Sequence, residues 1–268
     1  MPSRNAVGAG GRAGARDAYL WRLPATGLCF AIFGLGGLVF GLIVFPILRC
    51  LPGSAGVRRS RVRRTLSFAM RSFVAIMRGV GVLTYRFDGI RRLGRPGQLI
   101  VANHPSLIDV VFLLGFAPSS SCVVKASLLR NPFTRWPVAA AGYVSNASTD
   151  AMIEEGAATL RQGQSVIIFP EGTRTTPGQE LRFHRGAAAI AIRSAATVTP
   201  VFIRCEPTTL TKNEQWYQIP PSRPHFTLEV GEDIDPAPLR AAATSPVATR
   251  ALNERLLQIF TTKAAGGV

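Results

Sequence analysis

One stretch of the chain decides the fold: Leu99-Ile100-Val101-Ala102-Asn103-His104-Pro105-Ser106-Leu107-Ile108-Asp109. A short apolar run of the kind that forms a buried strand ends at polar residues, and a helical pattern follows as far as residue 116. In α/β proteins, sites form at the carboxyl ends of strands. The stretch therefore predicts a strand, a turn that carries His104, and a helix, in that order.

The alternation of short apolar runs with helical patterns continues from this stretch to the end of the chain. We expect strands over residues 83–87, 98–102, 122–124, 142–145, 165–169, 198–203 and 225–230. We expect helices over residues 106–116, 150–161, 185–195 and 247–261. The proline-containing residues 206–224 are expected to form a long loop. This alternation predicts an α/β domain around a largely buried sheet, over residues 84–268.

The segment that precedes this domain is apolar enough to enter a membrane. Residues 23–48 carry no charge, and a helix that crosses the hydrocarbon core needs about 20 apolar residues. A spanning helix is therefore expected. Because Pro46 and several glycines interrupt the segment, a re-entrant or monotopic insertion is the alternative. We attribute the Gly37-x-x-x-Gly41 spacing to the general frequency of glycine in membrane helices.

Most of the positive charge of the chain lies beside this apolar segment. The formal net charge is +16, and residues 1–95 hold 16 arginines against two aspartates. Residues 1–22, rich in Gly, Ala and Arg, are expected to form a disordered basic tail. Residues 49–83 mix arginines with apolar residues and predict a basic amphipathic helix on an anionic membrane surface. The alternative is an ordinary helix that packs its apolar side on the next domain.

The distribution of charge also bears on partners and on location. A nucleic-acid binder would need arginines spread through a folded domain together with aromatic stacking positions, whereas residues 96–268 are nearly neutral. A membrane-anchored nucleic-acid binder is therefore the weaker hypothesis. Residues 49–65 hold more arginines than the tail before the apolar segment. The positive-inside rule then places the C-terminal part in the cytoplasm.

His104 follows its strand directly, and Asp109 lies five residues further along the chain. A histidine acts as a general base when a carboxylate fixes its tautomer, so the two residues form a candidate dyad that removes a proton from an alcohol. Ser106-x-x-Asp109 is also the pattern of a helix capping box, in which Asp109 only satisfies backbone amides. From these residues alone, both interpretations stay open.

A second stretch has the same form: Ser165-Val166-Ile167-Ile168-Phe169-Pro170-Glu171-Gly172-Thr173-Arg174. An apolar strand again runs into a turn. Gly172 permits backbone conformations that few residues adopt, and the planar guanidinium of Arg174 suits a phosphate group. Glu171 either holds Arg174 or binds a substrate hydroxyl. The alternative is a surface turn with an internal ion pair. Four scattered cysteines and three histidines show no metal-ligand spacing.

Together the two stretches resemble the lysophospholipid acyltransferase family, which includes 1-acylglycerol-3-phosphate acyltransferases. Asn103, His104 and Asp109 match its N-H-x-x-x-x-D motif, and residues 169–174 match its F-P-E-G-T-R motif. The strand that begins at Val198 is similar to its V-x-P-V motif, and Lys125 lies where the family tends to carry a lysine. The resemblance implies a mixed sheet flanked by helices, with a membrane helix before it.

The resemblance also implies a reaction and a set of site residues. His104 removes a proton from the acceptor hydroxyl, Asp109 orients His104, and the acceptor oxygen attacks the thioester of acyl-CoA or acyl-carrier protein directly. The residues expected to bind substrate are Ser106, Lys125, Glu171, Gly172, Thr173 and Arg174. No bound cofactor and no metal are implied, and the acceptor is a membrane lipid such as 1-acylglycerol-3-phosphate. The expected location is the bacterial inner membrane, with the catalytic domain facing the cytoplasm.

One motif departs from the family pattern. The family often has G-x-I-F-I-D-R, whose arginine helps to hold the acceptor phosphate, whereas this chain has Gly142-Tyr143-Val144-Ser145-Asn146 with no arginine after it. This variant is similar to acyltransferases that accompany aryl-polyene lipid biosynthesis. A different lipid hydroxyl acceptor is therefore the alternative to lysophosphatidate. An inactive scaffold that keeps the fold is a third hypothesis, which the intact His104 and Asp109 disfavour.

Overall fold

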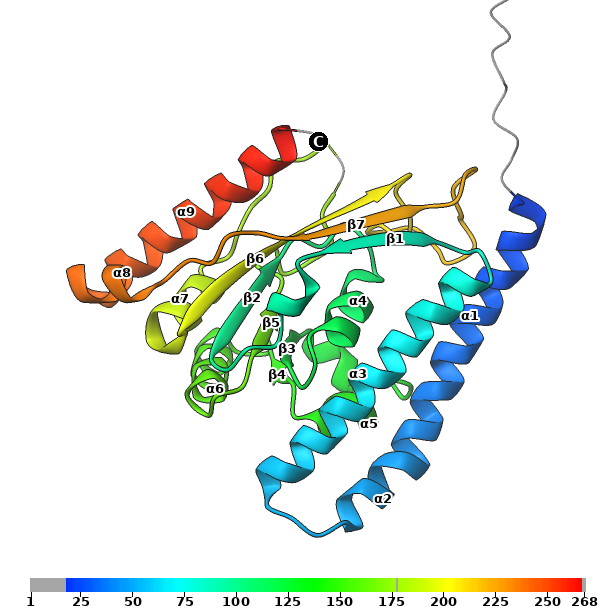
Figure 1. Cartoon of the computed structure of the whole chain (residues 1–268), viewed down its shortest axis with the longest axis horizontal. Helices are drawn as coiled ribbons and strands as arrows, with labels where there is room; N and C mark the ends of the chain where they lie inside the picture. The colour runs from blue at the N-terminus through cyan, green and yellow to red at the C-terminus, as the bar shows by residue number, and fades with distance from the viewer. Residues whose placement is uncertain (1–17, 177, 267–268) are drawn as a thin grey trace, which may run out of the picture.

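A computed structural model of the chain describes residues 18–176 and 178–266. A seven-stranded sheet forms its centre, with the strands in the order β1-β7-β6-β2-β5-β3-β4 (Figure 1). The strands are β1 (Thr84–Asp88), β2 (Gln98–Ala102), β3 (Ser121–Val124), β4 (Val144–Ser145), β5 (Val166–Ile168), β6 (Thr197–Glu206) and β7 (His225–Val230). Strands β2 to β6 run parallel to one another, and β7 pairs antiparallel with β6 and parallel with β1. The mixed sheet is as expected.

Helices cover both faces of this sheet (Figure 1). After β1 come α4 (Asp109–Phe116), α5 (Arg135–Ala141), α6 (Thr149–Arg161), α7 (Gly186–Ser194), α8 (Ala237–Ala242) and α9 (Ser245–Ala265), with short 3-10 turns η2 (Ile90–Arg92) and η3 (Ala126–Leu129). Four of these helices confirm expected ones to within a few residues, whereas α5 and α8 were not expected. Both are short and rich in alanine, so they show too little apolar periodicity to predict.

The core has two parts, one on each face of the sheet. Ile100 and Ile167 face a cluster that includes Phe112 of α4 and Val74 of the helix α3 (Ala55–Gly79), which precedes β1. Leu99 and Val101 of β2 face the other cluster, to which α7 and α9 contribute. Every residue of β2 is fully buried. Because both faces of β2 are covered, its sequence is continuously apolar after Gln98 rather than alternating.

The segment before β1 folds as a helical hairpin against the sheet domain (Figure 1). Its first arm is α1 (Tyr19–Val39), a π-helical turn η1 (Phe40–Val44) and α2 (Phe45–Cys50), and its second arm is α3 (Ala55–Gly79). Residues 19–50 are long and apolar enough to cross a membrane, and 17% of their most apolar window is buried. Residues 1–17 of the expected basic tail lie outside the described residues. Since residues 19–22 are helical, the helix begins before the expected boundary at residue 23.

Helix α3 buries part of its apolar side against the domain. Val62, Leu66, Val74 and Met77 are buried, and α3 packs along α4. This packing is the one expected under the alternative interpretation of residues 49–83, an ordinary helix that packs its apolar side on the next domain. Phe68 and Ile76 stay exposed among the arginines, so contact between that side of α3 and a membrane surface stays a prediction.

Glycines dock the first arm of the hairpin onto the domain. A Cβ atom at Gly27 would lie 3.2 Å from the ring of Trp216, and one at Gly41 would lie 2.6 Å from Cβ of Trp136. A Cβ atom at Gly37 would clash with the carbonyl oxygen of Phe133, and one at Gly34 would be in ordinary contact with the ring of Phe133 at 3.8 Å. These four glycines recur at intervals of three, four or seven residues, which places them on one side of a helix. Attributing the Gly37–Gly41 spacing to glycine frequency alone was therefore wrong: the spacing marks a packing face.

Candidate active site

His104 lies two residues after β2, and its ring is paired with Asp109. Nδ1 of His104 donates to Oδ2 of Asp109 at 3.0 Å. The side chain of His104 is 16% exposed and that of Asp109 is fully buried. Nε2 of His104 makes no hydrogen bond to any residue that the structure describes. The ring stacks on Phe169, with the ring centroids 4.3 Å apart. The imidazole is therefore held in one orientation, with one nitrogen left available.

Asp109 also holds the turn before α4, although α4 has Ile108 as its N-cap and no side-chain cap, so the expected capping box does not form. Oδ2 of Asp109 also accepts the backbone amide of Ser106 at 2.7 Å, and α4 begins at Asp109. The hydroxyl of Ser106 donates instead to the Thr209 carbonyl at 2.8 Å. Oδ1 of Asp109 is buried without a hydrogen-bond partner among the described residues. Burial raises the pKa of Asp109, while the His104 and Ser106 hydrogen bonds act in the opposite direction.

Glu171 reaches across from the end of β5 to the backbone of His104. Its Oε1 accepts the amide of His104 at 3.0 Å and the hydroxyl of Thr175 at 2.8 Å. The amide of Thr175 donates in turn to the carbonyl of His104 at 2.7 Å. Burial raises the pKa of Glu171, and the bonds from Thr175 and His104 lower it. The two motif turns are thus tied together, which adjacent pairing of β2 and β5 makes possible.

Arg174 holds the long loop that follows β6. One of its terminal nitrogens, Nη1, donates to the carbonyls of Leu210 and Thr211, each at 2.8 Å. The amide of Leu107 donates to the same Leu210 carbonyl. Together with the Ser106–Thr209 bond, these contacts bring residues 209–211 against the turn that carries His104. Arg174 does not form the ion pair with Glu171 that the sequence left open.

The remaining expected substrate-binding residues occupy different places. Gly172 has φ of 66°, a left-handed conformation that favours glycine, and a Cβ atom there would lie 3.2 Å from the ring of His184. Thr173 is exposed beside it. Lys125 is exposed at the carboxyl end of β3, outside the pockets described below. The substrate contacts of Ser106, Lys125, Glu171, Gly172, Thr173 and Arg174 stay predictions.

The stretch that departs from the family motif, from Gly142 onward, makes structural hydrogen bonds. Oδ1 of Asn146 accepts the amide of Ala126, the residue after Lys125, at 3.0 Å. Ser148 caps α6 by accepting the amide of Ala151. Neither residue lines the pocket beside the motif turns. No group of three His, Cys, Asp or Glu residues within the described ranges is arranged to hold a metal ion.

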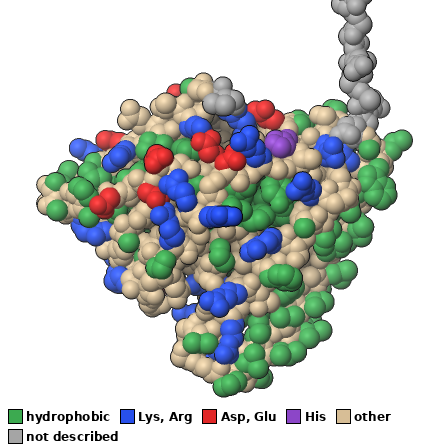
Figure 2. Space-filling model, in the orientation of Figure 1, with side chains coloured by type: hydrophobic (Ala, Val, Ile, Leu, Met, Phe, Trp, Pro, Cys, Tyr) green, Lys and Arg blue, Asp and Glu red, His purple; other side chains and the backbone are tan. Residues whose placement is uncertain are grey.

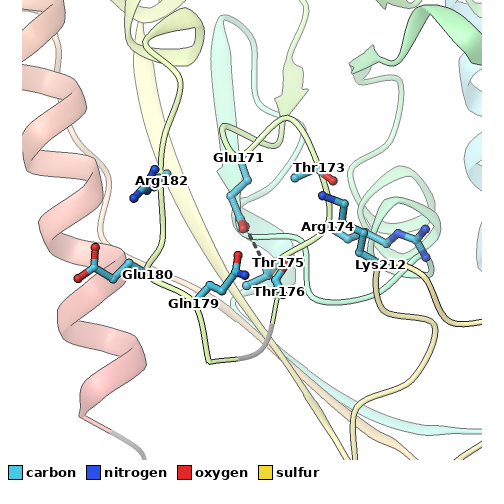
Figure 3. Close-up of a pocket in the computed structure, with 9 residues that line it drawn as sticks. All are labelled: Glu171, Thr173, Arg174, Thr175, Thr176, Gln179, Glu180, Arg182 and Lys212. Atoms are coloured by element: carbon cyan, nitrogen blue, oxygen red, sulfur yellow. Dashed lines mark hydrogen bonds between the residues drawn. The ribbon is translucent and has the colours of Figure 1, made fainter.

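A polar pocket of about 520 Å³ lies beside the motif turns (Figure 3). Its lining contains Glu171, Thr173, Arg174, Thr175, Thr176, Gln179, Glu180, Arg182 and Lys212. Arg174 and Lys212 lie together on one side of the pocket, and Glu180 and Arg182 lie on the side toward α9 (Figure 3). Cations and carboxylates are therefore mixed. Lys212 and Arg182 could not be predicted from the sequence, because the loop before α7 and the loop after β6 carry no motif.

A second, apolar pocket of about 340 Å³ lies between the helical hairpin and the turn after His104. Phe30 and Phe33 of α1, Met77 of α3, Val111 of α4, and Leu107 and Leu210 are among the residues that line it. Leu107 and Leu210 also flank the contacts that fix the His104 turn. The turn that carries His104 thus lies between an apolar pocket and a polar one. Residues 206–224 contribute to the lining of both pockets through contacts with residues far away in the chain. Such long-range contacts leave no pattern in the local sequence.

Comparison with known proteins is consistent with this arrangement. The sequence model of the family described as Acyltransferase matches residues 84–204, and the stretch that it matches includes both motif turns. A 1-acyl-sn-glycerol-3-phosphate acyltransferase of Pseudomonas aeruginosa is 29% identical over 182 residues, which are 66% of this chain and 69% of that protein. Residues 84–204 of the chain therefore match the acyltransferase family. The chain is an enzyme, as the two motifs predicted.

A second relative and a solved structure are also similar to this acyltransferase. A lyso-ornithine lipid O-acyltransferase of Pseudomonas aeruginosa is 34% identical over 64% of this chain and 65% of that protein. The crystal structure of the 1-acyl-sn-glycerophosphate acyltransferase PlsC from Thermotoga maritima superimposes with a TM-score of 0.63. The match covers 89% of this chain and 97% of that one at 19% identity. The fold is therefore shared over most of the chain.

Proposed function

We propose that this acyltransferase esterifies a hydroxyl group of a membrane lysolipid, with His104 as the general base. Nε2 of His104 takes the proton of the acceptor hydroxyl, and the acceptor oxygen attacks the carbonyl carbon of an acyl thioester. When the tetrahedral intermediate collapses, the C–S bond breaks and the thiolate takes the proton from His104. The donor is acyl-CoA or acyl-carrier protein. The hydrogen bond between Nδ1 of His104 and Asp109 carries this proposal.

Asp109 makes the proton transfer possible in two ways. Its Oδ2 fixes the tautomer that leaves Nε2 without a proton. When His104 becomes an imidazolium, the buried carboxylate lies 3.0 Å from the new charge and stabilises it in a site of low dielectric. The unpartnered Oδ1 of Asp109 adds to the negative potential there. Phe169, stacked on the imidazole, keeps the ring from turning away.

The two pockets divide a lysolipid between its polar and apolar parts. The acceptor headgroup occupies the pocket lined by Arg174, Lys212 and Arg182, and a fatty acyl chain occupies the pocket lined by Phe30, Met77 and Val111. The acceptor is 1-acylglycerol-3-phosphate, whose phosphate suits Arg174 and Lys212. Arg174 keeps Nε and Nη2 free of bonds to described residues, so it offers these nitrogens to the ligand while Nη1 holds the loop.

A lyso-ornithine lipid is the second candidate acceptor. An ornithine headgroup carries a carboxylate and an ammonium, and the polar pocket offers Glu180 opposite Lys212 as well as cations. The departing motif supplies no arginine to the polar pocket, which weakens the case for a phosphate monoester. The relative that is 34% identical is named for that activity.

The enzyme works at a membrane surface, with the helical hairpin in the interface. Large apolar side chains on the outer side of the hairpin are exposed, among them Leu28, Leu35, Leu42, Ile43 and Ile47. Because α1 is docked along its length on the domain through its glycines, the hairpin lies in one leaflet rather than spanning the bilayer away from the domain. The surrounding arginines favour the anionic cytoplasmic leaflet.

One assay tests this function. Purified full-length enzyme in non-ionic detergent is offered lysophosphatidate or lyso-ornithine lipid, with acyl-CoA or acyl-carrier protein as donor. We expect ester formation with one acceptor and a loss of about 10⁴-fold in kcat for His104→Ala. His184→Ala, which removes the histidine beside Gly172, is the matched control and keeps most of the activity. Full activity of His104→Ala would rule out the base, and turnover with neither acceptor would rule out both lipids.

A further inference from the structure

The helical hairpin contains a basic pocket that the acyl-transfer reaction does not use. About 540 Å³ in volume, it lies where α2, the first turns of α3 and α5 meet. Arg49, Arg58 and Arg59 line it together with Phe45, Val62 and Trp136, and no Asp or Glu is among the lining residues. It therefore combines three cations with an apolar wall. None of its lining residues is shared with the polar or the apolar pocket at the catalytic turn.

The charges in this pocket are not compensated by described residues. Arg49 and Arg59 form no hydrogen bond or ion pair with any residue in the described ranges, and Nη1 of Arg58 donates only to the Gly53 carbonyl. The guanidinium of Arg135 lies over the Trp136 ring at 4.5 Å and adds a fourth cation nearby. On the face shown in Figure 2, acidic side chains gather over the upper half of the molecule, away from this end of the hairpin.

The arginines also stand in an unfavourable place. Arg58 and Arg59 lie in the first turns of α3, which has no acidic residue there. The N-terminus of a helix carries partial positive charge, so cations destabilise it and an anion stabilises it. Behind them Arg63 is buried, with its guanidinium bonded to the carbonyls of Ala141 and Gly142. Burial lowers the pKa of Arg63, and the charge of Arg59 lowers it further. A bound anion would relieve all of these repulsions.

The apolar surroundings indicate which anion fits. The helical segment that contributes Phe45 and Arg49 to the pocket exposes Leu42, Ile43 and Ile47 on its outer side. A ligand with its charge among the arginines would lay apolar chains along these side chains. Free phosphate would satisfy the charge but leave the apolar wall uncovered. We propose that this pocket binds the headgroup of an anionic phospholipid, separately from the acyl donor and acceptor.

Binding of a soluble short-chain lipid tests the proposal. Dihexanoyl phosphatidylglycerol, kept below its micelle concentration, is titrated into full-length enzyme in non-ionic detergent, and the melting temperature is followed. We expect a saturable rise that dihexanoyl phosphatidylcholine does not produce. The variant Arg49→Gln/Arg59→Gln should bind the anionic lipid about tenfold more weakly, and Arg49→Lys/Arg59→Lys should recover most of the affinity because it restores the charge.

A charge-matched control separates the pocket from the general field of the protein. Arg91→Gln/Arg255→Gln removes two exposed arginines far from the hairpin turn, and it should bind as the unaltered chain does. Equal losses in the two glutamine variants would overturn the proposal in favour of diffuse attraction. Equal responses to the two lipids, or inorganic phosphate that binds as tightly as phosphatidylglycerol, would also overturn it. Turnover in lipid-free detergent should be the same for all these variants, so this test is independent of His104.

Discussion

Glu171 holds the main chain of His104. Its Oε1 accepts the His104 amide at 3.0 Å, and Thr175 bonds both to the same oxygen and to the His104 carbonyl. The turn after β2 is therefore clamped by the turn after β5 through its backbone, while Asp109 orients the ring of His104. If His104 is the base, as proposed, Glu171 acts on catalysis by positioning it.

Glu171→Ala should lower kcat much more than it raises KM. Loss of the clamp lets the His104 turn shift, and small misplacements of a base cost about 100-fold in rate. Glu171→Gln keeps an oxygen that accepts the two bonds, so it should retain most of the activity. Glu180→Ala removes a carboxylate from the same pocket without touching His104 and serves as the control. A higher KM for the acceptor with unchanged kcat would instead identify Glu171 as a binding residue.

Asp109→Asn should separate activity from stability. The variant keeps the shape of the side chain but loses the charge that stabilises the imidazolium, so kcat should fall by about 10⁴-fold, as for other orienting carboxylates. Burial raises the pKa of Asp109 in the folded chain. Deprotonation of this carboxyl is then less favourable in the folded state than in the unfolded one.

The pH dependence follows from the direction of that shift. Below the unfolded pKa of an aspartate, about 3.9, the carboxyl is neutral in both states and the two proteins should melt alike. As the pH rises through the folded pKa, the unaltered enzyme loses stability that the asparagine variant keeps. The melting temperature of Asp109→Asn should therefore exceed that of the unaltered chain at neutral pH. A variant that melts lower at pH 7 would mean that the charged form is favoured by folding.

The strand β2 and the His104–Asp109 pair could be predicted from the sequence, whereas the contacts that other elements make with them could not. Strand β2 and the pairing of His104 with Asp109 were predictable because both depend on residues close together in the chain. The clamp by Glu171 was not predictable, since it requires β2 and β5 to be neighbours, and strand order is not encoded locally. The capping and pairing interpretations of Asp109 competed in the sequence. In the structure one oxygen of Asp109 pairs with His104 and also accepts the Ser106 amide in the turn before the helix, but α4 has no side-chain cap.

Arg174 was predicted to bind substrate from its chemical type and from the family resemblance, whereas its partners in the structure are backbone carbonyls of a loop. Arg174→Ala leaves the Thr211 carbonyl without its donor and the Leu210 carbonyl with only the Leu107 amide. A carbonyl that stays buried without a donor costs about 1–3 kcal/mol. We expect a lower melting temperature and faster proteolysis within residues 206–224. Arg182→Ala, in the same pocket and exposed, should change neither. If Arg174→Ala melts normally and only KM for the acceptor rises, Arg174 serves the substrate and not the loop.

The glycines of the first helical arm distinguish a docked hairpin from a free membrane span. A Cβ atom at Gly41 would lie 2.6 Å from Cβ of Trp136, whereas one at Gly36 meets nothing within 4 Å. Gly41→Ala should therefore destabilise the enzyme by about 1–3 kcal/mol through overpacking. Gly36→Ala should be neutral or stabilising by about 0.5–1 kcal/mol, because glycine is costly inside a helix. Melting temperature in detergent is the measurement.

Gly41→Ala and Gly36→Ala are matched in hydropathy, which is the property that a membrane-spanning helix requires. Both add one methyl group to the same uncharged segment, so they raise its hydropathy equally. A helix that crossed the bilayer away from the domain would respond to both substitutions alike. A helix docked on Trp136 must respond to Gly41→Ala alone, because only there does the added carbon meet the domain. Equal effects of the two substitutions would therefore contradict the in-plane hairpin, and unequal ones would support it.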